Sequence, residues 1–377
     1  SARTGSIGVV ASVGVFEAGH VGTIIRYGER DILVTAFTNA QNITGTVQGT
    51  LPPSFLITVP STDEVQEGDV AIGQTSGWQG IVLSIVDGTQ FKAITTETFD
   101  PPTVGEQVSF PSTTQEVSAR VSTDPVASIA WDEQLMSAVH GWPAAGRFVK
   151  GRLALTSFVD APNVICLSSV RGFTEFGLGA NDDDAILRSV GAQSSRFLHL
   201  VDAGDLLIFS TGGLYFVKLS DGTALTPNSF VPVLVDARGS STVEPVVVDD
   251  GVVFVEASGA TISSAILDGD VYRKWSVRQL STLHNQQITN PVALCGPSLA
   301  ATEPEKYMFV INADGTMAVM SWTGKFGDAA VGFSPWVTQG TYQYLASAFG
   351  EYWAITGRSI DSVDTQFLER FDYGALV

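Results

Sequence analysis

The sequence is poor in the residues that characterise disulfide-rich, highly charged or membrane-spanning proteins. It has two cysteines and four histidines among 377 residues, and only 16% of its residues are charged. Two cysteines are too few for a disulfide framework, and we predict that Cys166 and Cys295, each inside an apolar run, are buried free thiols. No apolar run approaches the roughly 18 residues of a membrane span, so we expect no membrane-spanning segment.

Motifs for catalysis and nucleotide binding are also absent. The sequence has no G-x-S-x-G elbow, no P-loop and no G-x-G-x-x-G after a strand. The histidines His20, His140, His199 and His284 show no H-x-x-H or similar spacing, which argues against a zinc site, and His199 is expected to be a strand or core residue. A scattered carboxylate pair of the glycosidase type stays open, but none stands out. We expect no enzyme, no catalytic or metal-binding residues and no cofactor.

The charge balance is strongly acidic, with a formal net charge of -19 and a pI near 4.4. Basic contacts to phosphates supply most of the affinity for nucleic acid, so we expect no DNA-gripping surface, although DNA can pass a like-charged wall without sticking. The acidic run Asn181–Asp184 offers oxygen ligands of the kind that Ca²⁺ prefers, but it lacks EF-hand spacing. We interpret Asp182–Asp184 as a solvated or intersubunit acidic loop, with Ca²⁺ binding as the alternative.

The residues that are abundant favour strands joined by tight turns. The chain contains 38 glycines and 16 prolines alongside many Val, Thr, Ser and Phe residues, which predicts an all-β protein. We expect an N-terminal β module at 1–58, a small inserted β module at 59–118, a linker at 119–140 and a larger domain at 141–377. Asp87-Gly88, between two alternating runs, predicts a hairpin in the inserted module.

The larger domain shows a repeat of strand–turn–strand units. Their spacing of roughly 47 to 53 residues suits the blades of a β-propeller. Runs such as DLLIFS and VVFVE are apolar on both alternating faces, as in strands that are covered on both sides. We therefore predict a β-propeller-like domain of about five or six blades. Its turns are expected near Gly151, Gly204, Gly251 and Gly350, with the fourth unit beginning near Glu305.

Helix is expected to be rare. Trp275, Leu280 and Leu283 lie at approximately helical spacing, which predicts one short helix between blades. The stretch 123–139 fits either a helix that begins near Pro125 or an extended crossing into the larger domain. The Asp-Gly pair within Asn312–Thr316 predicts a hairpin turn.

A series of short motifs follows in order from the middle of the chain. It consists of Trp142-Pro143, Gly151-Arg152-Leu153, Pro162 to Ser168, Gly172-Phe173 with Phe176, Asp182 to Ile186 and DLLIFSTGGLYFV, with VFEAGHVGTIIR upstream and DGVVFVEASGATISSAIL, MFVINADGTMAVMSW and FLERFD downstream. The series resembles the tail nozzle (distal tail tube) proteins of short-tailed bacteriophages over most of the chain. The segment 59–118 does not match, and members of that family are commonly longer before the first module.

The resemblance implies a structural virion protein rather than an enzyme. It implies a homo-oligomeric ring, a hexamer, that surrounds the distal DNA-exit channel and attaches to a tail adaptor or tail-tube protein, with a tail fibre or spike as a further partner. Phage DNA would pass without sequence-specific binding, and the protein would lie in the virion tail after assembly in the host cytoplasm. The alternative is a receptor- or glycan-binding propeller of a virion, with Trp275, Trp322, Trp336 and Trp353 as its candidate aromatic cluster.

A short basic stretch opens the larger domain. Arg147, Lys150 and Arg152 are too few for a DNA-binding patch, and we predict that they balance nearby acidic groups at the first blade or at a subunit contact. Trp142-Pro143 is interpreted as the crossing from the small β modules into the propeller.

Overall fold

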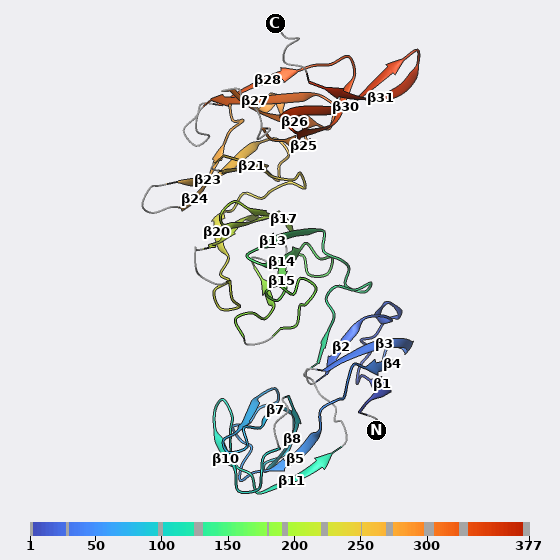
Figure 1. The fold of residues 1–377 in the computed structure, drawn as a ribbon, viewed down its shortest axis with the longest axis vertical. Helices are drawn as coiled ribbons and strands as arrows, with labels where there is room; N and C mark the ends of the chain where they lie inside the picture. The colour runs from blue at the N-terminus through green and yellow to red at the C-terminus, as the bar shows by residue number, and fades with distance from the viewer. Residues whose placement is uncertain are drawn as a thin grey trace. The chain divides into compact units, whose positions relative to one another are not determined.

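The chain is built almost entirely from antiparallel β-strands (Figure 1), as the composition predicted. In the part that the computed structural model describes, the other regular elements are two short 3-10 helices, and there is no α-helix. No helix in that part is long and apolar enough to span a membrane. The described residues are 3–27, 30–96, 101–123, 131–178, 181–190, 195–219, 225–249, 251–268, 274–297, 305–323 and 331–371.

The chain divides into two compact units, Ser1–Trp142 and Pro143–Val377. The division falls at Trp142-Pro143, where the sequence predicted the entrance to the larger domain. The N-terminal unit contains two sheets and the C-terminal unit contains five.

The first sheet of the N-terminal unit has five strands and a small apolar core. Phe16, Ile25, Val34 and Ile43 are buried together and form part of that core. The strand order is β1 (Gly5–Val10), β4 (Asn42–Val47), β3 (Arg30–Asn39), β2 (Ile24–Tyr27) and β12 (Trp131–Glu133).

The second sheet has seven strands and packs around the fully buried Trp78. The hairpin predicted at Asp87-Gly88 is present, because β7 and β8 pair across that turn. The strand order is β10 (Thr114–Glu116), β9 (Gln107–Ser109), β6 (Val70–Gly73), β7 (Gln79–Asp87), β8 (Gln90–Thr95), β5 (Ser54–Thr58) and β11 (Ala119–Thr123).

The segment 119–140, expected as a linker, supplies an edge strand to each of these sheets. Its β11 pairs with β5 of the second sheet, and its β12 pairs with β2 of the first. Residues 124–130, which lie between the two strands, fall outside the described part. Where the stretch 123–139 is described, it ends β11 at Thr123, forms β12 at Trp131–Glu133 and then bends and turns, with no α-helix.

The C-terminal unit is a series of antiparallel sheets in which consecutive strands are neighbours. The sequence predicted about five or six blades, and the described residues of this unit form five sheets. The first of these sheets consists of β13 (Ala145–Val149), β14 (Arg152–Thr156), β15 (Val164–Leu167) and β16 (Ile186–Ser189), and the second of β17 (Phe197–Asp202), β18 (Leu206–Ser210), β19 (Gly213–Val217) and β20 (Val233–Asp236). The third consists of β21 (Val246–Val248), β22 (Gly251–Val255), β23 (Ile262–Asp268) and β24 (Lys274–Gln279), and the fourth of β25 (Pro291–Cys295), β26 (Glu305–Asn312), β27 (Met317–Thr323) and β28 (Gly332–Trp336). The fifth has three strands, β29 (Thr341–Ala348), β30 (Glu351–Ile360) and β31 (Val363–Arg370).

Successive sheets of this unit pack face to face through apolar clusters. In β18, Leu206 and Ile208 pack against the sheet β13–β16, whereas Leu207 and Phe209 pack against the sheet β21–β24. Phe209 meets Phe254 of the third sheet with ring centroids 5.2 Å apart. Strands with two apolar faces therefore lie between two other sheets, and the propeller-like all-β class is confirmed.

The predicted turns between strands are mostly where the sequence placed them. Gly204 lies between β17 and β18 with a φ of 89°, a left-handed backbone that glycine adopts without steric cost. Gly151 and Gly350 also lie between paired strands, as does the Asn312–Thr316 turn. Gly251 differs, because it is the first residue of β22.

The short helix predicted around Trp275 is wrong. Lys274–Gln279 forms the strand β24, and the regular helix that follows is the 3-10 turn Asn285–Gln287. Trp275 and Val277 share one face of β24 and pack into the core between the second and third sheets, while Leu283 is 85% exposed. Pairing with β23 therefore overrides the helical spacing.

Candidate metal centre

The first residue of the candidate site lies on a short turn of helix beside the first sheet. His20 ends the 3-10 helix η1 (Ala18–His20), and only 2% of its surface is exposed. Its Nδ1 accepts a hydrogen bond from the amide of Glu17 at 2.8 Å and lies 3.1 Å from the carbonyl oxygen of Glu17. Phe16 packs edge-on against the ring at 6.0 Å. The imidazole is therefore held in place on its Nδ1 side, with Nε2 turned toward Glu133.

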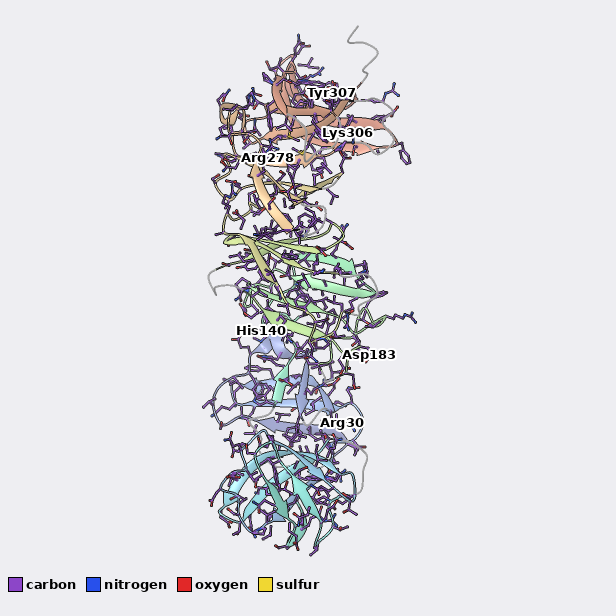
Figure 2. All side chains as sticks on the ribbon, turned by 90° about the vertical axis from the view of Figure 1, so that its left-hand side faces the viewer. Arg30, His140, Asp183, Arg278, Lys306 and Tyr307 are labelled. Atoms are coloured by element: carbon purple, nitrogen blue, oxygen red, sulfur yellow. The ribbon has the colours of Figure 1, made fainter. Side chains whose placement is uncertain are left out.

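The other two residues lie at the end of β12 and on the turn that follows it. Glu133 is the last residue of β12 and stands opposite Ile25 of β2. His140 (labelled in Figure 2) sits in a tight turn that is closed by a bridge between Ser137 and Gly141, and its amide donates to Ser137 Oγ at 3.1 Å. These backbone pairings bring both side chains back to the helix that carries His20.

The three side chains meet through the Glu133 carboxylate. Oε2 lies 3.0 Å from His20 Nε2, and Oε1 lies 2.7 Å from His140 Nε2. All three donor atoms lie within 4.8 Å of one another. The side chains of Glu133 and His140 are 32% and 24% exposed, so the buried His20 forms the floor of a site that is open to solvent.

This arrangement has the dimensions of a zinc site. Zinc takes His nitrogens at about 2.0–2.1 Å and carboxylate oxygens at about 2.0–2.2 Å, so two of its ligand atoms are at most about 4.2 Å apart. In the tetrahedral geometry that zinc prefers, the ligand atoms lie about 3.4 Å apart. The two Glu133–histidine separations of 3.0 and 2.7 Å would widen slightly, and the separation between the histidine nitrogens, at most 4.8 Å, would shorten by up to about 1.4 Å. Two imidazoles and one carboxylate are also a ligand set that zinc uses when one coordination position is left for water.

The tautomer of His20 distinguishes a metal-bound state from a hydrogen-bonded one. A ring that donates from Nε2 to Glu133 accepts the Glu17 amide at Nδ1. A ring that binds a metal through Nε2 instead donates from Nδ1, and the Glu17 carbonyl oxygen is within reach of that proton. A backbone carbonyl is a common outer partner of a metal-binding histidine.

Sequence spacing could not have revealed this site. His20 lies 113 residues before Glu133, and His140 lies 7 residues after it. Motif rules compare neighbours along the chain, whereas these residues meet because β12 pairs with β2. The same pairing brings Gly19, next to His20, close to the residue before His140, because a Cβ added at Gly19 would lie 3.0 Å from Val139 Cγ2.

The acidic run that was weighed as a Ca²⁺ site is instead organised around a buried arginine. Arg152 is fully buried and donates to the backbone carbonyl oxygens of Asp182, Asp183 (labelled in Figure 2) and Asp184 at 2.8, 3.4 and 2.6 Å. Further bonds go to the carbonyls of Ser168 and Leu225. Burial lowers the pKa of Arg152, and the charges of Asp183 and Asp184 oppose that shift.

The basic stretch therefore differs in part from its prediction. Arg152 lies beside acidic residues of the first blade, as predicted, and the charges of Asp183 and Asp184 act on it. Its hydrogen bonds, however, go to backbone carbonyl oxygens of the acidic loop, and its side chain is buried. Arg147 and Lys150 are exposed on β13 and the turn that follows it.

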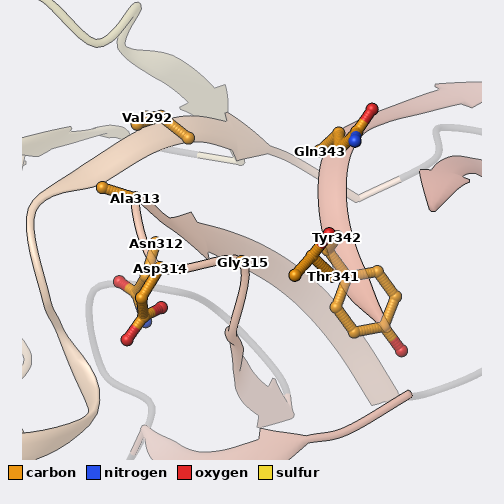
Figure 3. A pocket seen from close by; sticks show the side chains of 8 residues that line it. All are labelled: Val292, Asn312, Ala313, Asp314, Gly315, Thr341, Tyr342 and Gln343. Carbon is orange, nitrogen blue, oxygen red and sulfur yellow. The ribbon is translucent and has the colours of Figure 1, made fainter. Parts of the chain in front are cut away.

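A shallow pocket of about 320 Å³ lies beside the β26–β27 turn (Figure 3). The polar side chains there are already engaged. Asn312 bonds to Gln287, Thr316 and Thr289, and Asp314 accepts two bonds from Thr316, which lower the pKa of Asp314. Burial raises the pKa of Tyr342, and the charge of Glu369 adds to that effect. These residues present no convergent set of reactive groups.

Three further predicted residues are structural. Cys166 and Cys295 are free and buried, and burial raises the pKa of their thiols to about 12 and about 11. Both thiols are therefore protonated and unreactive at neutral pH. His199 is half-buried on β17 with Nε2 3.3 Å from the carbonyl oxygen of Ser241, and burial lowers its pKa.

The four tryptophans proposed for glycan binding do not form an exposed cluster. Trp275 and Trp322 are each only 2% exposed and lie in the apolar layers between sheets. Trp336 is half-buried against Phe309, with ring centroids 5.8 Å apart, and Trp353 is half-buried on β30.

Comparisons with known proteins find similar solved structures but no match among family models or curated proteins. Solved structures that are similar include two provisionally named 6-phosphogluconolactonases. The one from Bacteroides uniformis is 10% identical with a TM-score of 0.34, over 85% of this chain and 99% of that chain. The one from Bacteroides fragilis is 9% identical with a TM-score of 0.33, over 85% and 98%. At TM-scores this low, the similarity assigns no activity.

The roles that the sequence resemblance implied are corrected here. Both similar structures are named as enzymes and neither as a tail protein. This contradicts the expected tail-nozzle subunit, its receptor- or glycan-binding alternative, and the expectation that the chain is not an enzyme, and we carry none of them further. The resemblance itself and the virion location are tested by no comparison and stay predictions.

Proposed function

We propose that the N-terminal unit binds one zinc ion through His20, Glu133 and His140. The observation that carries the proposal is the convergence of these three donors, from separate segments, to within 4.8 Å. Imidazole nitrogens suit zinc and its first-row neighbours, whereas Ca²⁺ and Mg²⁺ prefer sites made of oxygen alone. The ligand chemistry therefore favours a transition metal.

The bound ion would fasten the end of the N-terminal unit to its first sheet. β12 is only three residues long and pairs with β2 through Trp131, Asp132 and Glu133. A metal that joins His20 to Glu133 and His140 adds a cross-link where backbone pairing is short. Metal binding of this kind contributes directly to folding free energy. Because the three ligands join the helix η1 to β12 and the turn that follows it, the role that we propose is stabilisation of the N-terminal unit.

Zinc should stabilise the full chain, and the loss of one ligand should remove that effect. At a hundredfold excess over its Kd, zinc should raise the free energy of unfolding of the N-terminal unit by about 2.7 kcal/mol. Loss of a residue that only hydrogen-bonds to a metal ligand costs roughly 10–100-fold in metal affinity. His140→Gln removes a ligand itself, so it should raise the Kd for zinc by more than this. Calorimetric titration with Zn²⁺ and urea unfolding with and without Zn²⁺ measure the two quantities. Binding should also weaken on acidification, because protons compete for the imidazoles.

The matched control is His284→Gln, the same substitution in the C-terminal unit. His284 stacks near Phe333 and lies outside the cluster. This variant should bind zinc as the parent chain does. A hydrogen-bonded cluster that binds no metal would show no stabilisation by zinc in any of the three proteins, and equal binding by both variants would place the ion elsewhere. Either result contradicts the proposal.

A further inference from the structure

The last sheet of the C-terminal unit has one strand fewer than the other four. In the described part of the chain it contains β29, β30 and β31, and β31 pairs with β30 alone. The inner face of the sheet is covered, because Tyr342, Leu345, Tyr352 and Ala354 pack against the preceding sheet. Figure 1 shows the β30–β31 hairpin, in red, extending away from its neighbours.

The open edge at β31 has the regular geometry of a strand that can pair again. It runs for eight residues without proline, and its register with β30 is unbroken from Val363 to Arg370. The hairpin turns through Asp361 and Ser362, both with positive φ, the backbone of a two-residue turn that matches strand twist. A long regular edge presents unpaired N–H and C=O groups to another strand.

An exposed apolar row leads to this edge. Tyr344, Ile355 and Leu368 are direct partners across the three strands and are 58%, 37% and 70% exposed. The row ends at Leu368 on the edge strand, where a strand added alongside could bring a further side chain against it. Cross-strand pairs of this kind are the main source of side-chain stabilisation in a sheet.

The charges of β31 match a second copy of itself. Directly opposed residues in an antiparallel pair either both hydrogen-bond to each other or both do not. Neighbouring residues along one strand alternate between these two states, so a residue cannot lie opposite its own neighbour in a symmetric pair. A symmetric pairing of two identical strands is therefore centred on a residue and not between two residues. Centred on Phe367, the pairing places Asp364 opposite Arg370 of the second copy, twice by symmetry. Centred one residue earlier, it places Asp364 opposite Leu368, and centred one residue later it leaves Asp364 outside the overlap.

We propose that β31 pairs antiparallel with β31 of a second copy, centred on Phe367. The two three-stranded sheets then form one six-stranded sheet, with an Asp364–Arg370 pair at each end of the junction. Both side chains are exposed and lie on the same face as Leu368. Arg370 also pairs with Glu351 at 3.0 Å, an exposed contact that the pairing with Asp364 would share or replace. The proposal does not depend on the metal site, which belongs to the N-terminal unit.

Sedimentation equilibrium of the full chain and charge variants tests this pairing and its register. The parent should dimerise, and Asp364→Arg or Arg370→Asp should each raise the dimer Kd about tenfold, because two attractive pairs become repulsive. The double variant should restore the parent value. Glu64→Arg, an equal charge change at an exposed residue of the N-terminal unit, is the matched control and should leave the Kd unchanged.

Disulfide trapping gives an independent measure of the register. Residue 366 lies opposite residue 368 in the proposed pairing, so a mixture of Gln366→Cys and Leu368→Cys chains should cross-link as a heterodimer faster than either chain alone. A parent chain that stays monomeric at all concentrations overturns the proposal. So do a dimer that the single charge variants leave unchanged, a double variant that is not restored, and a heterodimer that forms no faster than the homodimers.

Discussion

Arg152→Met should lower the free energy of unfolding of the C-terminal unit by about 3–5 kcal/mol, because hydrogen bonds to a charged group contribute roughly 1.5–3 kcal/mol each and the two to buried carbonyls are lost without replacement. Methionine fills similar space but donates no hydrogen bond. Five backbone carbonyl groups, from Ser168, Asp182, Asp183, Asp184 and Leu225, then lose their donor. The losses at Ser168 and Leu225 are the costly ones, because both residues are buried and water cannot replace the missing donor there, whereas Asp182 and Asp183 are exposed.

Urea unfolding followed by circular dichroism measures this loss, and two further variants sharpen it. Arg147→Met makes the same change at an exposed arginine on the neighbouring strand and should stay within about 0.5 kcal/mol of the parent. Arg152→Lys should be intermediate, because a lysine ammonium cannot span carbonyls that a planar guanidinium reaches together. Equal stabilities of the Arg147 and Arg152 variants would show that the carbonyl contacts contribute nothing.

Glu106→Ala should destabilise the N-terminal unit by about 3–4 kcal/mol, because a buried carboxylate there accepts four hydrogen bonds. Glu106 is 4% exposed. Its Oε1 accepts from the amides of Thr75 and Ser76 and from Ser76 Oγ at 2.8, 2.6 and 2.9 Å, and Oε2 accepts from the Thr103 amide at 2.8 Å. The side chain thus joins the β6–β7 turn to the segment before β9.

The contribution of Glu106 should depend on pH in a defined direction. Burial raises the pKa of Glu106, but the hydrogen bonds from Ser76, Thr103 and Thr75 together outweigh it and hold the pKa below its ordinary value of 4.5. A carboxyl whose pKa is lower in the folded state stabilises fully above its unfolded pKa. That stabilisation is lost as the pH falls from about 4.5 through the lower folded-state pKa.

Glu106→Gln separates the charge from the shape of the side chain. The amide keeps one oxygen acceptor but turns its NH₂ group toward a backbone N–H, so we expect a smaller loss than for alanine, about 1.5–3 kcal/mol at neutral pH. Unfolding measured from pH 7 to pH 3 should show a shallower acid loss than in the parent. Glu64→Gln, on the exposed surface, is the control and should keep the parent slope. An unchanged slope in Glu106→Gln would contradict the assigned pKa direction.

The sequence predicts the local parts of this fold well. Glycine-marked turns such as Gly204 and Gly350 and the two-faced apolar strand β18 depend on neighbouring residues, and all are where the pattern placed them. The prediction of a helix around Trp275 was wrong. Three apolar residues lie there at helical spacing, but Trp275 and Val277 alternate as in a strand and pack together into the core from β24. Sheet pairing decides such cases, and pairing is not local.

The candidate site could not be predicted from local patterns for the same reason. His20 and His140 meet because a short strand near the end of the N-terminal unit returns to β2. Arg152 was singled out by its charge, but its partners are backbone carbonyls, which carry no residue-type signal. Contacts to backbone and contacts across more than a hundred residues both require the three-dimensional fold.

Histidine ¹H–¹⁵N correlation spectra during a zinc titration test the central claim most directly, because the chain has only four histidines to resolve. One equivalent of Zn²⁺ should shift the ring nitrogens of His20 and His140 to the pattern of metal at Nε2 and a proton at Nδ1, with His199 and His284 unchanged. Spectra in which no ring responds, or in which His199 or His284 responds in place of His20 and His140, would contradict the zinc site.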